Sequence, residues 1–155
     1  MKKALKIISV ILIAIIVLLI GRKVYYSNIE IKPNDVYLKS EISGENIKMN
    51  MGSYSWQDKG INVVADSISA QNIENLKTLE VKQNEKIYFT HCNWNKATAR
   101  LLLVNEDDVI GVSVEVNVNE NYIIVPHFEG EYIIQLDLSS DKGNVWYASK
   151  LNIVK

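Results

Sequence analysis

The longest apolar stretch of the chain lies near its amino terminus. Residues 7–20 read IISVILIAIIVLLI, in which Ser9 is the only polar side chain. The run is apolar on all sides rather than along one helical stripe, which is typical of a helix surrounded by lipid and not of one packed on a core. Counted from Ala4, the run has 17 residues. As an α-helix it is about 26 Å long, at the short end for a bilayer core of about 30 Å.

The flanks of this run indicate how it is used. Three lysines and the α-amine precede or open it, whereas two basic residues follow it, so the amino terminus is expected inside and the rest outside. No small-x-small cleavage pattern and no lipid-accepting cysteine follow Ile20, which favours an uncleaved anchor over a cleaved signal peptide. We therefore expect a single-pass protein of the cell membrane, with the lipid bilayer as its first partner. The expected parts are a membrane anchor over 1–23, a juxtamembrane linker over 24–34 and an extracellular domain over 35–155.

Beyond residue 34 the pattern changes to short apolar or alternating runs that are separated by turn residues. These runs are 35–40, 46–50, 52–56, 61–65, 78–82, 86–90, 99–104, 109–118, 122–125, 131–138 and 145–154. Strand-like runs with turns about every eight to twelve residues predict an antiparallel β-sandwich. Only residues 69–77 have a helical pattern, with Ser69 as a candidate N-cap.

The last two runs form the clearest hairpin. Tyr132, Ile134, Leu136 and Leu138 alternate onto one face of the first run. The Gly130-Glu131-Tyr132 sequence at its start resembles the tyrosine corner of immunoglobulin-like sandwiches, although an ordinary loop glycine before an edge strand is an alternative. The predicted fold class is therefore an all-β, immunoglobulin-like antiparallel β-sandwich preceded by one N-terminal transmembrane helix.

The distribution of charged residues along the chain indicates which classes of partner the expected extracellular part can bind. The chain has 17 basic and 18 acidic residues, but five of the basic residues lie within the first 23 positions. The remaining 12 basic and 18 acidic residues give the expected extracellular part a net charge of about −6. An acidic domain does not favour nucleic-acid binding and is compatible with cations or basic partners. The single cysteine excludes an internal disulfide.

Residues 51–70, MGSYSWQDKGINVVADSISA, resemble a motif of small exported or membrane-anchored Firmicute proteins of unknown function. Those proteins combine G-x-Y-x-W, a glycine turn and an Asp-Ser pair with a C-terminal hairpin that opens on G-x-Y. The matching residues are Gly52, Tyr54, Trp56, Gly60, Asp66, Ser67, Gly130, Tyr132, Gly143 and Tyr147. The chain departs from the motif at Ala70, where a proline is usual, and at Ser149, where an aromatic is usual. The resemblance implies a bacterial, exported sandwich protein and no activity.

The candidate metal and nucleophile residues are few. A zinc site needs three or four ligands, and neighbouring side chains such as His91 and Cys92 point to opposite faces of a strand. Cys92 with His127 has the residue types of a nucleophile and its base, but no glycine-rich oxyanion loop accompanies them. We expect no metal, no cofactor and no catalytic residue.

Two acidic segments have calcium-loop features. The Asp137-x-Ser139-x-Asp141-x-Gly143 pattern has lysine where an EF-hand loop has its glycine and Ala148 where it has glutamate, so a hairpin turn is preferred. Residues 106–108, Glu-Asp-Asp, are either a weak calcium site or a solvated turn.

Aromatic residues are the remaining candidates for contact with a partner. Trp94 lies in the polar stretch HCNWNK, and the sequence leaves open whether it is an exposed anchor or a core residue. Tyr54 and Trp56 are expected on one strand face with Gly52, and for Trp56 the core is preferred. Asp66 is a candidate cap of the short helix that follows it.

These observations favour a non-enzymatic module that binds or regulates at the cell envelope, with an envelope protein as a possible partner. One alternative is a structural spacer at the membrane surface. Another is a small hydrolase or a weak calcium-dependent binder. An exposed aromatic patch would favour the binding module, and a wholly charged surface would favour the spacer. A pocket with converging carboxylates would favour the hydrolase or calcium-dependent binder.

Overall fold

The computed structural model describes residues 11–22, 31–65, 69–90, 93–104 and 109–155. The chain divides into two compact units, residues 1–31 and 32–155. In the first unit, residues 11–22 form an α-helix with exposed side chains. Across the described residues, no helix has the length and apolar character needed to cross a membrane. The other residues of the predicted anchor, 1–10 and 23, lie outside the described ranges.

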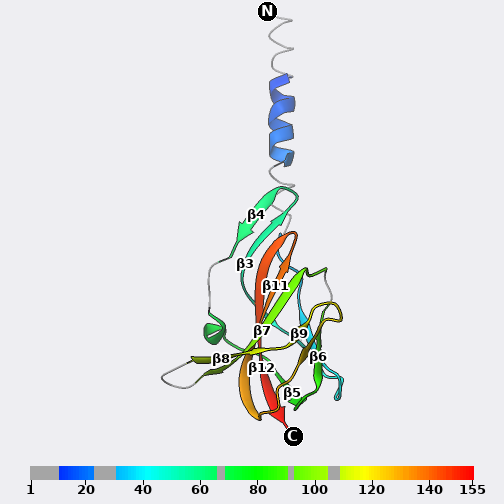
Figure 1. Cartoon of the computed structure of the whole chain (residues 1–155). Coiled ribbons are helices and arrows are strands. Elements are labelled where there is room, and N and C mark those ends of the chain that lie inside the picture. Colours follow the sequence, from blue (N-terminus) through cyan, green and yellow to red (C-terminus); the bar gives the residue numbers. More distant parts are fainter. Residues whose placement is uncertain (1–10, 23–30, 66–68, 91–92, 105–108) are drawn as a thin grey trace, which may run out of the picture. The chain divides into compact units, whose positions relative to one another are not determined.

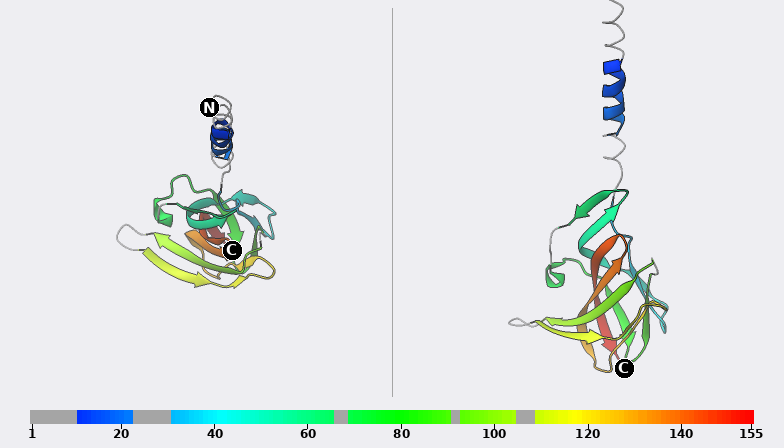
Figure 2. Two further views of the ribbon diagram at one scale, coloured as in Figure 1. Left: turned by 90° about the horizontal axis from the view of Figure 1, so that it is seen from above. Right: turned by 45° about the horizontal axis from the view of Figure 1, so that its top comes forward.

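The second unit consists of two β-sheets packed together (Figures 1 and 2). The five-stranded sheet has the order β2-β1-β6-β10-β9, and the seven-stranded sheet has the order β4-β3-β12-β11-β7-β8, with β5 also pairing with β12. All pairings are antiparallel except β5 with β12. The strands are β1 (Tyr37–Ser40), β2 (Asn46–Lys48), β3 (Asn50–Asp58), β4 (Ile61–Val64), β5 (Thr78–Lys82), β6 (Lys86–Phe89), β7 (Lys96–Val104), β8 (Val109–Val114), β9 (Val116–Asn117), β10 (Tyr122–Ile124), β11 (Gly130–Ser140) and β12 (Gly143–Val154).

The predicted sandwich-like arrangement of antiparallel strands is confirmed, and each of the predicted runs overlaps a strand. The predicted helix over 69–77 is wrong. A single 3-10 turn, η1 (Ala70–Asn72), is present, and Ser69 at its N-cap makes no side-chain capping bond. Asn75, with a φ of 58°, is in the left-handed region and is incompatible with a continuing helix.

The main core lies between the two sheets. In β11 the side chains of Ile134, Leu136 and Leu138 are at most 1% exposed, which confirms the face predicted from their alternation. In β12 the ring of Tyr147 is fully buried. Each such side chain contributes about 1.5–3 kcal/mol by leaving water, which makes this hairpin the centre of the domain's stability.

Tyr132, at the start of β11, makes a local hydrogen bond through its hydroxyl. The Tyr132 hydroxyl donates a hydrogen bond of 3.1 Å to the backbone carbonyl of Glu129. The Tyr132 ring also lies against Phe128, with 5.3 Å between ring centroids. Gly130 has a φ of 135°, and a Cβ there would be 3.2 Å from the Tyr132 ring. The G-x-Y sequence therefore lets the ring fold back over its own turn.

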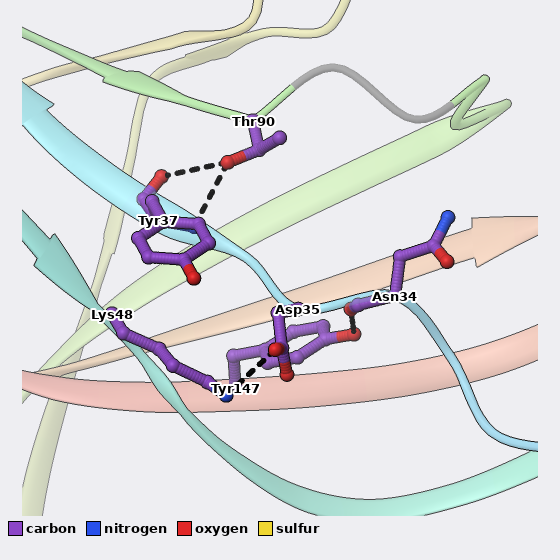
Figure 3. A network of polar contacts seen from close by, with 6 residues as sticks. All are labelled: Asn34, Asp35, Tyr37, Lys48, Thr90 and Tyr147. Atoms are coloured by element: carbon purple, nitrogen blue, oxygen red, sulfur yellow. Dashed lines mark hydrogen bonds and ion pairs between the residues drawn. The ribbon is translucent and has the colours of Figure 1, made fainter.

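The segment that leads into β1 is held firmly against the sandwich. The buried Tyr147 hydroxyl donates to the backbone carbonyl of Asn34, and Lys48 forms an ion pair of 2.6 Å with Asp35. This polar network is made by Asn34, Asp35, Tyr37, Lys48, Thr90 and Tyr147 (Figure 3). The first residues of the domain are thus fixed before its first strand begins.

Candidate functional site

The seven-stranded sheet has a second apolar cluster on the face opposite the main core. Leu102 of β7 and Ala148 of β12 are buried there beneath Ala70 of η1. Ile73, Leu76, Ile133 and Trp146 pack around these three residues. The segment over residues 69–77 is therefore the cover of this outer cluster.

Hydrogen bonds to backbone carbonyls of the covering segment hold it on the sheet. The carbonyl of Lys77 accepts bonds from the Lys150 backbone N–H at 2.8 Å and from the Ser149 hydroxyl at 3.0 Å. The Asn50 side-chain amide donates to the Glu74 carbonyl at 3.3 Å. Ser149 is fully buried, and the bond to the Lys77 carbonyl gives its hydroxyl the partner that a buried polar group needs.

A β-bulge in β3 explains the glycine of the G-x-Y-x-W sequence. Tyr54 pairs with Val145 and Met51 pairs with Tyr147, so two residues of β3 lie opposite Trp146 alone. A Cβ on Gly52 would be 2.2 Å from the Trp146 ring, and the indole N–H donates to the Ser53 hydroxyl at 2.6 Å. The prediction that Gly52 shares a face with Tyr54 and Trp56 is therefore wrong, because the bulge turns Gly52 toward the outer cluster.

A groove of about 370 Å³ opens beside this outer cluster. Apolar side chains from three separate segments line it, namely Ile73 and Leu76, Leu102, and Ile133. Its remaining lining residues are Glu131, Tyr132 and Lys150. The volume is within the range of about 300–1,000 Å³ that small ligands and side-chain clusters occupy.

The charged lining of the groove comes from neighbouring strands. Lys150 pairs with Ile133 across β11 and β12, and Glu131 lies two residues before Ile133, so both charges lie on the groove side of the sheet. Both side chains are exposed. The groove therefore offers an apolar wall with one carboxylate and one ammonium beside it, an arrangement suited to a partner that carries both apolar and charged groups.

Trp94 and Trp56 lie together in the interior. Each is 7% exposed, and their rings meet edge to face with 6.1 Å between centroids. The Trp94 indole N–H donates to the Thr90 carbonyl at 3.4 Å. Neither tryptophan is an exposed anchor in this structure, whereas Tyr54 is half-buried. A partner contact by these residues stays a prediction, with Tyr54 the one that has accessible surface.

Of the candidate metal and nucleophile residues His91, Cys92 and His127, the structure describes His127 alone. His127 is exposed and its ring lies 5.9 Å from that of Phe128. Asp66, Ser67, His91, Cys92 and residues 106–108 lie outside the described ranges. Within the described ranges, no three His, Cys, Asp or Glu side chains are grouped so as to hold a metal ion.

The acidic pattern from Asp137 to Gly143 belongs to the final hairpin. Pairing between β11 and β12 continues to Ser140 opposite Gly143, so the turn contains only residues 141 and 142. Asp137 and Ser139 are paired strand residues, with Trp146 and Asn144 as their respective partners. The preferred hairpin reading is confirmed.

A tyrosine cluster on the outer face of the five-stranded sheet was not predicted. The rings of Tyr88 and Tyr122 meet at 70° with centroids 6.1 Å apart, and the Lys86 ammonium lies 4.4 Å from the Tyr122 centroid. The Tyr88 hydroxyl donates to Glu41 at 3.2 Å. Desolvation, followed by this hydrogen bond, raises the pKa of Tyr88 above its ordinary value. The alternation of Lys86 and Tyr88 along one run was the available sequence signal.

No protein-family model, curated protein or solved structure matches this chain. Its function is therefore inferred from the groove and from the surfaces that surround it.

Proposed function

We propose that the protein is a membrane-anchored extracellular β-sandwich module that binds a protein or another component of the cell envelope without catalysing a reaction. The observation that carries this proposal is the groove on the outer face of the seven-stranded sheet, with its wall of Ile73, Leu76, Leu102 and Ile133. Ile73, Leu76 and Ile133 are half-buried, so each keeps some apolar surface that a partner would remove from water, and covering apolar surface is stabilising.

The lining chemistry supports binding rather than hydrolysis. The groove has one carboxylate, Glu131, and one ammonium, Lys150. Glycoside hydrolysis commonly relies on two carboxyl groups across the scissile bond, and a hydrolytic triad needs a nucleophile held by a base. A carboxylate and an ammonium beside an apolar wall instead orient a partner that has complementary charges.

Attachment to the membrane rests on the apolar run over residues 7–20 and its basic flanks. The described part of this run, residues 11–20, is helical. A helix extended back to Ala4 would have 17 residues, which is the lower limit for crossing a bilayer, with the Lys6 side chain reaching the headgroups. The immunoglobulin-like assignment and kinship with small exported Firmicute proteins are likewise proposals, and the Tyr132 corner supports the first.

A spacer at the membrane surface is a second candidate. The network in Figure 3 favours it, because Tyr147 and Lys48 fix the chain at Asn34 and Asp35, where the expected linker ends and the expected domain begins. A spacer requires a domain that is firmly folded where its chain begins, and these contacts lie within residues 32–155.

Localisation is tested on intact cells that produce the full chain with an epitope after Lys155, which is exposed. We expect the protein in the membrane fraction and loss of the epitope when protease is added outside the cells. An epitope that is cut only after lysis would refute the extracellular orientation, and a protein found in the soluble fraction would refute the anchor.

Binding is tested by placing a photo-crosslinking amino acid at Glu131, on the groove, or at Lys39, an exposed residue of β1 in the other sheet. We expect a discrete crosslinked product from position 131 and none from position 39. Equal products from both positions, or a product from position 39 alone, would contradict binding at the groove. A complete absence of products at saturating illumination would favour the spacer.

A further inference from the structure

The seven-stranded sheet, which carries the groove, ends in an edge strand that is exposed and uncharged. β8 (Val109–Val114) is the last strand of its sheet and pairs only with β7 among the described strands. Residues 110–113 are all exposed, with Ile110 at 52% and Val112 at 43%. The β7–β8 hairpin projects from the side of the sandwich (Figures 1 and 2). One row of backbone N–H and C=O groups along β8 is therefore available to another strand.

β8 lacks the features that protect the other edges. Among the edge strands of the two sheets, β2, β9 and β4 have four residues or fewer, and β5 carries Glu80 and Lys82. β8 has six residues, VIGVSV, with no charge and no proline. Natural edge strands are usually short, charged, bulged or covered, because a long uncharged edge pairs with other chains. The absence of these features at β8 indicates an edge that is kept available for pairing.

The two faces of β8 differ and so define what can pair with it. Ile110, Val112 and Val114 pair with Leu103, Leu101 and Ala99, which places them on the side of the main core. Gly111 and Ser113 lie on the other side, opposite Leu102 and Arg100. An added strand would therefore place apolar side chains next to Ile110 and Val112, and polar or small side chains at the alternate positions.

Charge distinguishes a second copy of this chain from a different partner. Along the sequence, residues 105–118 contain four acidic residues and no basic residue. In the sequence, three acidic residues directly precede β8 and Glu115 directly follows it. Antiparallel pairing of two copies of β8 would bring the end of each strand to the start of the other, and so acidic residues to acidic residues. Like charges opposite one another are destabilising, and residues 24–155 carry a net charge of about −6. The edge is therefore suited to a segment with basic residues.

We propose that β8 is the docking strand for an extended segment of another protein, with alternating apolar residues flanked by lysine or arginine, which adds to the seven-stranded sheet. This inference rests on the proposed binding function and names the form of the partner. One residue of β7 lies between the groove and this edge: Leu102 lines the groove, and a Cβ on Gly111 of β8 would be 3.3 Å from its Cδ2 atom. Backbone hydrogen bonds provide the affinity, and the alternating side chains provide the specificity.

The test uses the full-length protein in detergent and a fluorescent peptide of about ten residues, in which valine and threonine alternate between two lysines at each end. A matched peptide has glutamates in place of the lysines. Binding is measured by anisotropy, and protection of the β8 amides is measured by hydrogen exchange. We expect the lysine peptide to bind at least about tenfold more tightly than the glutamate peptide and to protect β8. Equal binding of both peptides, no binding of either, or binding without protection of β8 would overturn the proposal.

Two substitutions locate the binding edge. Val112→Lys places a charge on β8, and Val64→Lys is the matched control on β4, the opposite edge of the same sheet, where Val64 is 74% exposed. We expect Val112→Lys to weaken binding of the lysine peptide at least about tenfold and Val64→Lys to change it less than about twofold. Ile110→Lys repeats the test if Val112→Lys does not fold, as judged by its melting midpoint. Equal losses in the β4 and β8 variants would overturn the assignment to β8.

Two further results separate this inference from its alternatives. Sedimentation that shows a wild-type dimer, dissociated by Val112→Lys, would assign the edge to a second copy and overturn the proposed partner. Loss of peptide binding in Ile133→Glu but not in Val112→Lys would place the peptide in the groove. That result would support the proposed binding function and refute β8 as the docking strand. If peptide binding depends on β8 and position 131 gives no crosslinks, β8 is supported as the docking strand and binding at the groove is refuted.

Discussion

Replacing Gly52 by alanine tests the packing on which the groove depends. The added Cβ would lie 2.2–2.3 Å from three atoms of the Trp146 six-membered ring, closer than any tolerated carbon contact. The ring has to move, and the hydrogen bond of 2.6 Å from its N–H to the Ser53 hydroxyl is lost or weakened. Overpacking costs about 1–3 kcal/mol and the lost bond about 0.5–1.5 kcal/mol, so we expect a destabilisation of about 3 kcal/mol.

The assay is thermal and urea unfolding of the full-length protein in detergent, followed by tryptophan fluorescence. A loss of about 3 kcal/mol corresponds to a fall in Tm of roughly 10 °C for a domain of this size. Gly111→Ala in β8 is the matched control, because its Cβ would be 3.3 Å from a single flexible Leu102 methyl group, and its effect should stay below about 1 kcal/mol.

A double-mutant cycle identifies the cause. Trp146→Phe removes the ring atoms that Gly52→Ala meets, so the double variant should be less destabilised than the sum of the single variants by at least about 1 kcal/mol. An unchanged Tm in Gly52→Ala, or strict additivity in the cycle, would refute the steric explanation of this glycine.

Three further substitutions test the hydroxyl groups of tyrosines. Tyr132→Phe removes the bond to the carbonyl three residues earlier and should lower the free energy of unfolding by about 1 kcal/mol in urea titrations, and an unchanged midpoint would refute the corner. Tyr147→Phe leaves the Asn34 carbonyl without its buried donor and should cost about 1–3 kcal/mol, more than Tyr132→Phe; the reverse order would contradict the role of the entry network. Desolvation and then the Glu41 hydrogen bond raise the pKa of Tyr88, so its contribution to stability is complete below about pH 10 and is lost as the pH rises through the folded-state pKa. Tyr88→Phe should therefore reduce the loss of stability above pH 10, and an identical pH profile would contradict the shift.

The strands could be predicted because their information is local. Alternation in β11 and β12 follows from a side-chain period of two, and it gave the buried face of Ile134, Leu136 and Leu138 without reference to any other strand. The turn at residues 141–142 was equally local, because its residues are typical of a tight hairpin.

The corrections arise where tertiary contacts override local pattern. Ala70, Ile73 and Leu76 have a spacing of three, which favours a helix, but the segment gains more by lying over Leu102 and Ala148 in an irregular conformation. The polar neighbours of Trp94 left its exposure undecided, because its burial against Trp56 depends on a strand almost forty positions away.

The face of Gly52 was likewise inaccessible to pattern analysis. A single extra residue in β3 reverses the side to which the following residues point, and nothing in GSY itself indicates the bulge. The groove was missed for a related reason, because its wall is assembled from the covering segment, β7 and β11, each of which has an ordinary pattern by itself.

The position of Leu102 links the groove to the free edge in a way that constrains any partner. Leu102 lines the groove, belongs to the outer cluster with Ala148, and faces Gly111 across the β7–β8 pair. A strand added to β8 would restrict the motion of Gly111, and through it the rotamers of Leu102, without touching the groove directly. Occupation of the edge should therefore alter binding at the groove, and by thermodynamic linkage the groove should alter binding at the edge by the same factor. A larger side chain at position 111 that changes both affinities would reveal this coupling, whereas independent affinities would mean that the two surfaces serve separate partners.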